Sequence, residues 1–225
     1  MFDKIAQTET IESSYIYNME HKNIKDLYEK YGLIDIRSLQ PSIKKDIKYA
    51  TKDNFTGEIL YTEDCGLYCI PTLAKAVAQA QNDLKKIDNK LSLVIFDAAR
   101  PLSIQKKMFT LVQGTESERF IANPNGEHAG GFHNYGMAVD VAIIDDKGKM
   151  LDFGTGYDSF DELAHSGGEA ELVKNNKLSL EAYNNRLLLY YIMGKNGMLP
   201  YIYEWWHFQL EYDEQKKSNY KLLDF

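Results

Sequence analysis

The sequence predicts an α+β protein in which helices flank a mostly antiparallel central sheet. Two short, continuous apolar runs, residues 91–98 and 137–144, have the length and composition of buried strands. Apolar residues recur at helical spacing in three further segments, over 71–87, after residue 101 and over 180–195. The predicted strands are joined once by a helix and once by a hairpin, and this mixture favours the α+β class.

The helices are predicted from apolar spacing and from their end residues. The first begins at Pro71, where the missing amide hydrogen of proline costs no hydrogen bond. Its apolar face comprises Leu73, Val77, Ala80, Leu84 and Ile87. The second begins at Pro101, and the side expected to face the core comprises Ile104, Met108, Leu111 and Val112. The third ends near Gly197, because glycine adopts the left-handed conformation that terminates many helices.

The strands follow from apolar and aromatic runs bounded by turn residues. After strand 137–144, the sequence DDKG at 145–148 predicts a turn, and KMLDF predicts the returning strand of a hairpin. The aromatic run YIYEWWHFQLEY at 201–212 predicts one further strand. Residues 113–136 are rich in Gly, Asn and Ser and predict a long loop, a kind of segment that often carries function.

Composition and charge limit the classes of function. Lys and Arg total 26 against 33 Asp and Glu, so a net charge of −7 gives no overall attraction to nucleic acid. No run of about eighteen apolar residues is present, so no membrane span is expected. No apolar leader core is visible near the start, so a cytoplasmic protein is expected, with a periplasmic one as the alternative if a leader has been removed. No repeat or Pro/Gly-rich linker divides the chain, which predicts a single domain over 1–225.

Two polar residues stand out near the strand at 137–144. Asp140 lies in its middle, where a carboxylate costs several kcal/mol unless it is paired or binds a metal. A buried salt bridge or a hydrogen-bonded Asp is the alternative. His133 precedes it by seven residues, and Gly136 allows a sharp turn between loop and strand. A lone loop His is usually a surface residue, but beside Asp140 it supplies a metal-ligand pair.

Glu204 and His207 flank two tryptophans in the sequence EWWH. A spacing of three places them on opposite faces of a regular strand, so they share one site only if the strand bends or ends there. An exposed pair on an edge strand is the alternative. Together with His133 and Asp140, His207 completes a set of three ligands that leaves a fourth tetrahedral position for water, as in catalytic zinc sites. Glu204 is then well placed to remove a proton from that water.

Arg100 follows the strand at 91–98, in the sequence DAARP. A guanidinium offers several donors and stays charged, so it suits a developing oxyanion. Pairing with Asp97 is the alternative. Cys65 and Cys69 have a spacing that fits neither a redox motif nor a zinc knuckle, and we expect two buried thiols.

Taken together, these residues resemble the D-alanyl-D-alanine dipeptidases of the vancomycin-resistance type, zinc peptidases related to D,D-carboxypeptidases. The family pattern Ser-x-His-x-x-Gly-x-Ala-x-Asp is matched over 131–140, with Gly131 in place of Ser, and Glu-x-Trp-His is matched over 204–207. Further matches are KYATKDNFTG (48–57), DAARP (97–101), FGTGYD (153–158) and SNYKLLDF (218–225). The likeness runs from about residue 46 to the C-terminus, and residues 1–45 are expected to be an extension packed on the domain.

The resemblance implies a D,D-peptidase (hedgehog-like) architecture and one Zn²⁺ per chain, bound by His133, Asp140 and His207. It implies that Glu204 is the general base and later protonates the leaving amine, while Arg100 stabilises the oxyanion.

Substrate recognition is implied at two further positions. The resemblance implies that Tyr49 and Asp158 would hold the free amino group of the substrate, and that the reaction would be hydrolysis of D-Ala-D-Ala to two D-alanines. Two positions near the substrate depart from the family pattern. Gly131 replaces the family Ser, and Ala99 replaces the commoner aromatic residue before Arg100.

Three alternatives remain at this point: a D,D-carboxypeptidase, a dipeptidase for other D-residue peptidoglycan fragments, and a zinc-containing binding protein without turnover. The expected partner is a small D,D-dipeptide, with no nucleic acid and no membrane span. Resistance to a glycopeptide antibiotic and recycling of cell-wall dipeptide are equally compatible purposes.

Overall fold

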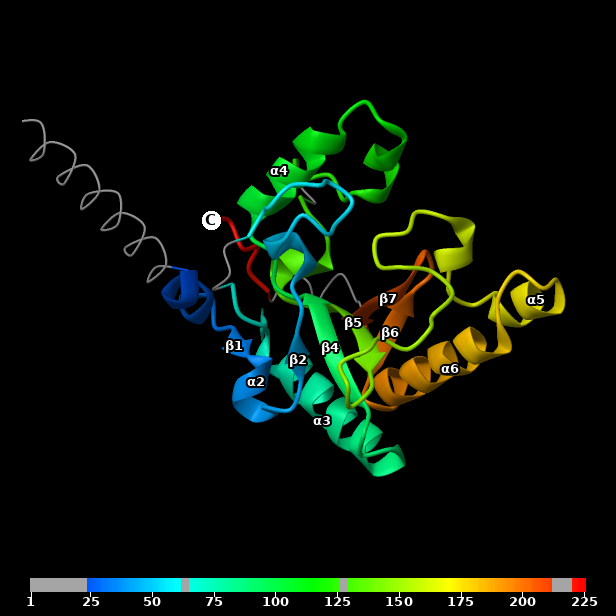
Figure 1. Ribbon diagram of the computed structural model, residues 1–225. Coiled ribbons are helices and arrows are strands. Elements are labelled where there is room, and N and C mark those ends of the chain that lie inside the picture. Colours follow the sequence, from blue (N-terminus) through cyan, green and yellow to red (C-terminus); the bar gives the residue numbers. More distant parts are fainter. Residues whose placement is uncertain (1–23, 62–64, 126–128, 212–219) are drawn as a thin grey trace, which may run out of the picture.

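The computed structural model describes residues 24–61, 65–125, 129–211 and 220–225. Its centre is a five-stranded sheet with strand order β2-β4-β5-β7-β6 (Figure 1). The strands are β2 (Lys44–Lys45), β4 (Ser92–Asp97), β5 (Ala138–Ile144), β6 (Met198–Tyr201) and β7 (Glu204–Leu210). Strand β2 pairs parallel with β4, and the other neighbours pair antiparallel. The α+β class is therefore confirmed, with a mixed sheet.

The remaining elements surround this sheet. A small second sheet pairs β1 (Ile34–Asp35) with β3 (Tyr68–Cys69). The helices around it include α2 (Ile36–Leu39), α3 (Pro71–Ile87), α4 (Leu102–Val112), α5 (Glu169–Lys174) and α6 (Leu180–Lys195). Helices α3 and α6 contact each other beside the sheet, whereas α4 lies apart from them, near the other end of the strands (Figure 1).

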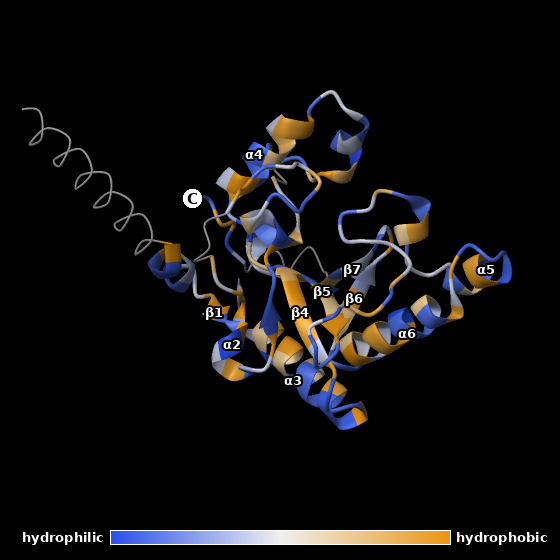
Figure 2. Ribbon diagram, in the orientation of Figure 1, coloured by the Kyte–Doolittle hydropathy of each residue, from blue (hydrophilic) through white to orange (hydrophobic). Residues whose placement is uncertain are grey.

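The core is built on the two central strands. Every residue of β4 and of β5 is buried, as their continuous apolar runs predict. Strand β4 is hydrophobic along most of its length, while α3 alternates hydrophobic and hydrophilic residues (Figure 2). The segment before β2 also contributes to this core, through Tyr28, Leu33, Ile36 and Ile43. None of the described helices is long and apolar enough to cross a membrane.

The three predicted helices are present at the expected places, with two errors in their apolar faces. Ile87 is 53% exposed and Leu111 is 44% exposed. Ile87 is the last residue of α3. Leu111 directly precedes Val112, and neighbouring residues point about 100° apart around a helix, so only the buried Val112 faces the core.

The predicted single strand at 201–212 is wrong, because the structure has a hairpin there. Strands β6 and β7 are separated by Ile202 and Tyr203, both of which are exposed. The aromatic run is β-prone throughout and lacks a Gly or Pro to mark the turn. The expected hairpin between residues 137–144 and 149–153 is present only as a single bridge between Ile144 and Met150. The predicted loop 113–136 contains two short 3₁₀ helices, Glu116–Phe120 and Phe132–Tyr135.

Candidate metal centre and active site

His133, Asp140 and His207 are brought together by β5, its antiparallel neighbour β7 and the segment just before β5. Asp140 of β5 is the direct cross-strand partner of His207 of β7, so the two side chains lie on the same face. His133 lies in the 3₁₀ helix before β5. Gly136 ends that helix with φ = 66°, in the left-handed region, and a Cβ there would lie 3.0 Å from a methyl group of Leu33.

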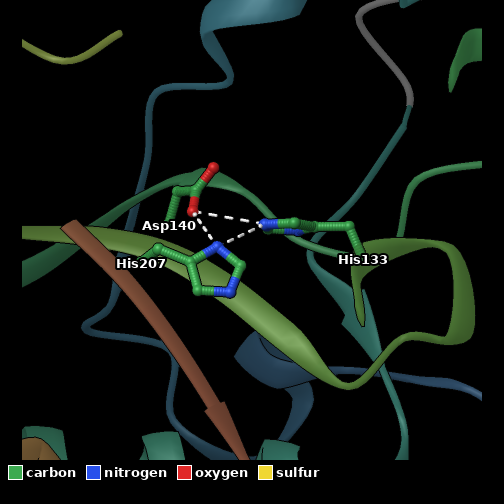
Figure 3. Close-up of side chains that lie close together, drawn as sticks. All are labelled: His133, Asp140 and His207. Atoms are coloured by element: carbon green, nitrogen blue, oxygen red, sulfur yellow. Dashed lines mark hydrogen bonds and ion pairs between the residues drawn. The ribbon is translucent and has the colours of Figure 1, made fainter. Parts of the chain in front are cut away.

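The donor atoms of these three residues form a nearly equilateral triangle (Figure 3). His133 Nε2 lies 3.1 Å from His207 Nδ1, and each of these nitrogens lies 3.2 Å from Asp140 Oδ1. All three residues are buried. Among the described residues, this is the group of His, Cys, Asp and Glu side chains close enough to hold a metal ion.

Outer hydrogen bonds orient each of the three donor side chains. A carbonyl oxygen only accepts, so His133 Nδ1 donates to Ala98 O at 2.7 Å and leaves Nε2 with its lone pair. His207 Nε2 contacts Gln209 Oε1 at 3.1 Å, which leaves Nδ1 free in the same way. The Tyr157 hydroxyl donates to Asp140 Oδ2 at 2.8 Å. Such outer contacts are the usual support of metal ligands.

The chemistry of this donor set fits a divalent metal ion. Two nitrogen lone pairs and a carboxylate oxygen facing one another within 3.2 Å repel unless a proton or a metal ion lies between them. Donors about 2.0–2.1 Å from a tetrahedral zinc ion are roughly 3.3 Å apart, close to the separations observed. Burial alone would raise the pKa of Asp140, but His133 and His207 hold that pKa below its ordinary value.

Glu204 lies beside this triangle. It is the first residue of β7, and the register of the β6–β7 hairpin shifts between Pro200 and Tyr201. This irregular start of the strand places Glu204 Oε2 3.7 Å from His207 Nδ1, although a regular strand would separate the two faces. Burial raises the pKa of Glu204 to about 7, which suits a group that takes up and releases a proton near neutral pH.

Arg100 pairs with Asp97, the partner that the sequence analysis gave as its alternative. Its Nε and Nη2 donate to Asp97 Oδ2 at 2.9 and 2.6 Å, and its Nη1 donates to Gln105 Oε1 at 2.9 Å. The guanidinium also lies over the Tyr49 ring, 5.2 Å from its centroid. Both members of the ion pair are buried, so Arg100 is fixed in orientation.

Tyr49 and Asp158 are in contact, as shared recognition of one group requires. The Tyr49 hydroxyl donates to Asp158 Oδ1 at 3.0 Å, and the Phe55 amide donates to Asp158 Oδ2 at 3.3 Å. Asp158 has φ = 59°, a strained conformation for a residue other than glycine. Burial, together with the charge of Asp140, raises the pKa of Asp158 to about 7. A cation bound beside it would oppose that shift.

All of the predicted site residues line one cavity of about 310 Å³. Its lining includes Tyr49, Arg100, His133, Asp140, Asp158, Glu204 and His207. Gly131 also lines it, and a Cβ there would lie 3.3 Å from the Ala122 methyl group. Ala99 is absent from the lining, and its carbonyl instead accepts from the buried Tyr28 hydroxyl. A larger and more open depression, about 1120 Å³, contains no such group of metal ligands.

Sequence reasoning missed several residues that support the site, among them Tyr157 and Gln209. Gln209 follows His207 by two residues, and the alternation of a strand places both on one face. Tyr157 directly precedes Asp158 in FGTGYD, a segment singled out only for the acid. His165 does not line the catalytic cavity, and His21 and His128 lie outside the described residues.

Comparison with known proteins matches this chain to one family over most of its length. The family model described as D-ala-D-ala dipeptidase matches residues 29–224. The D-alanyl-D-alanine dipeptidase of Escherichia coli (strain K12) is 32% identical over 194 residues, which cover 85% of this chain and 89% of that protein. The protein of the same name from Enterococcus faecalis (strain ATCC 700802 / V583) is 26% identical, covering 80% of this chain and 91% of that protein. The one from Enterococcus faecium is 25% identical, covering 84% and 96%.

Proposed function

The chain belongs to the D-Ala-D-Ala dipeptidase family of metallopeptidases, and on that premise we propose that it hydrolyses free D-Ala-D-Ala to two D-alanines with one Zn²⁺. The observation that carries this proposal is the triangle of His133, Asp140 and His207 donor atoms with Glu204 beside it. Two imidazoles and one carboxylate with a neighbouring acid are the ligand and base types of catalytic zinc sites. We also propose that residues 1–225 form one domain.

The reaction needs a metal ion, a base and an anion-stabilising group. A zinc ion at these ligands supplies Lewis acidity, which lowers the pKa of water to about 7 and polarises the scissile carbonyl. Glu204 takes one proton from the attacking water as the carbon–oxygen bond forms. It then delivers that proton to the leaving nitrogen as the carbon–nitrogen bond breaks. Arg100, fixed by Asp97, presents its guanidinium to the oxygen that gains charge.

Selectivity for a free dipeptide follows from the other end of the cavity. Asp158 is held by the Tyr49 hydroxyl and the Phe55 amide, and its carboxylate lines the cavity. A substrate ammonium is the complementary group, and an N-acylated peptide lacks it. Free D-Ala-D-Ala is therefore expected to be cleaved faster than an N-acylated pentapeptide. Faster cleavage of the acylated peptide would instead support a D,D-carboxypeptidase.

The test of the base is a comparison of Glu204→Gln with the wild-type enzyme. The variant keeps the side-chain volume and is expected to keep its zinc while kcat falls about 10²- to 10⁴-fold, the usual contribution of general acid–base catalysis. Glu162→Gln is the matched control, because Glu162 is exposed and does not line the catalytic cavity. Near wild-type turnover by a zinc-replete Glu204→Gln enzyme would refute the assignment of the base. A wild-type protein that binds zinc but hydrolyses no D,D-dipeptide would favour a binding protein.

A further inference from the structure

The cavity of the proposed site borders two neighbouring hollows, and different charged residues lie at the two borders. At one end it shares Phe55 and Asp158 with the larger depression beyond. At the other end it opens toward a third cavity of about 380 Å³, and the residues common to both are Arg119, Phe120, Phe160, Tyr201 and Glu204. An acid therefore marks the first end, whereas an arginine and the proposed base mark the second.

Arg119 differs from the other arginine in this cavity. Arg100 is committed to Asp97 and Gln105. Within the part of the chain that the structure describes, Arg119 makes no ion pair, and its guanidinium lies over the Phe120 ring at 4.7 Å from the centroid. The Phe120 ring is in turn stacked on Phe160, with centroids 4.7 Å apart and planes 2° apart. Arg119 is exposed, and its guanidinium rests on this stacked pair of rings.

The chemistry of the substrate is complemented by a cation near Glu204. A free dipeptide carries an ammonium on its first residue and a carboxylate on its second. If Glu204 protonates the leaving nitrogen, the second residue lies near Glu204, and its carboxylate is separated from that nitrogen by a single carbon. The Asp158 end suits the ammonium, so the carboxylate faces the end shared by Glu204 and Arg119.

We propose that Arg119 binds the C-terminal carboxylate of the dipeptide, an assignment that rests on the dipeptidase function proposed above. A guanidinium matches a carboxylate with two parallel hydrogen bonds, which an ammonium group does not reproduce. Recognition of both termini, by Asp158 and by Arg119, restricts the enzyme to substrates of dipeptide length. Loss of the carboxylate, as in a C-terminal amide, therefore weakens binding even when the scissile bond is unchanged.

The test compares hydrolysis of D-Ala-D-Ala and of its C-terminal amide by the zinc-loaded wild type, Arg119→Met and Arg119→Lys. For the wild type we expect kcat/KM to favour the free acid. Arg119→Met should raise KM for the acid about tenfold, the low end for a charged hydrogen bond because the site is exposed, with kcat little changed. The same variant should leave the amide unaffected, and Arg119→Lys should fall in between. Arg37→Met, an exposed arginine of α2 outside the cavity, is the control.

The outcomes separate the two proposals. An equal loss on acid and amide in Arg119→Met would show a structural role and overturn the carboxylate assignment. An unchanged KM for the acid would overturn it as well. In both cases the wild type still cleaves D-Ala-D-Ala, so the dipeptidase function stands. A zinc-replete wild type that cleaves neither substrate overturns the dipeptidase function, and the carboxylate assignment with it.

Discussion

The Tyr157 hydroxyl offers a direct probe of the proposed metal centre, because it contacts a ligand without being one. It donates to Asp140 Oδ2 at 2.8 Å, while Asp140 Oδ1 faces the two histidines. Tyr157→Phe removes this hydrogen bond and leaves the three donor atoms in place. The phenyl ring keeps the contacts that Tyr157 makes with Phe96 and Trp206.

The magnitude follows from the type of hydrogen bond lost. A hydrogen bond to a charged group contributes about 1.5–3 kcal/mol. Since about 1.4 kcal/mol corresponds to a factor of ten, the zinc affinity should fall roughly 10- to 100-fold. The loss arises because Asp140 is less firmly oriented and its second oxygen is left without a partner inside a buried site.

The assay is competition for zinc between the protein and a chelator of known affinity, for the wild type and for Tyr157→Phe. Tyr190→Phe is the matched control, since the Tyr190 hydroxyl donates to Glu169 at 2.6 Å and lies outside the catalytic cavity. Its zinc affinity should equal that of the wild type. A zinc affinity of Tyr157→Phe within twofold of the wild type, or an equal loss in the control, would refute the reasoning.

Two further predictions concern Asp97, which pairs with Arg100, and Asp158, which lines the cavity. Asp97→Asn should lower the free energy of unfolding by about 3 kcal/mol in urea titrations, because the Arg100 charge stays buried without its partner. Glu171→Gln, in an exposed pair with Lys174, should change it by less than about 1 kcal/mol, and similar values for both variants would contradict the argument. Because the folded-state pKa of Asp158 is about 7, above its unfolded value near 3.8, the folded protein holds a proton that the unfolded chain releases between those pH values. The stability of the metal-free protein should therefore fall as pH rises through that window, and Asp158→Asn should weaken this fall. Parallel plots of Tm against pH for the wild type and for Asp158→Asn would contradict the prediction.

The proposed ligand set could be predicted from the sequence because its residues conflict with their surroundings. Asp140 interrupts a fully buried strand, and a charge in such a place requires a partner. His133 precedes that residue by seven positions, and His207 lies in the aromatic strand segment at 201–212. The cross-strand register that opposes Asp140 and His207 gives the physical reason for their contact.

Other parts of the site could not be predicted, because they depend on features that local sequence patterns do not contain. The position of Glu204 depends on a tight turn at Ile202 and Tyr203, where exposed hydrophobic residues give no turn signature. The support of His133 comes from the backbone carbonyl of Ala98, an atom that every residue type provides. Arg119 lies in the long loop predicted over 113–136, and only the fold places it at the end of the catalytic cavity.

The most direct test of the central proposal is an assay of free D-Ala-D-Ala hydrolysis. Turnover is measured before metal removal, after treatment with a chelator, and after zinc is returned. We predict release of two D-alanines per dipeptide, loss of nearly all turnover after chelation, and recovery at about one zinc ion per chain. Turnover that persists in metal-free protein, or a zinc-replete protein that leaves the dipeptide intact, would contradict the proposal.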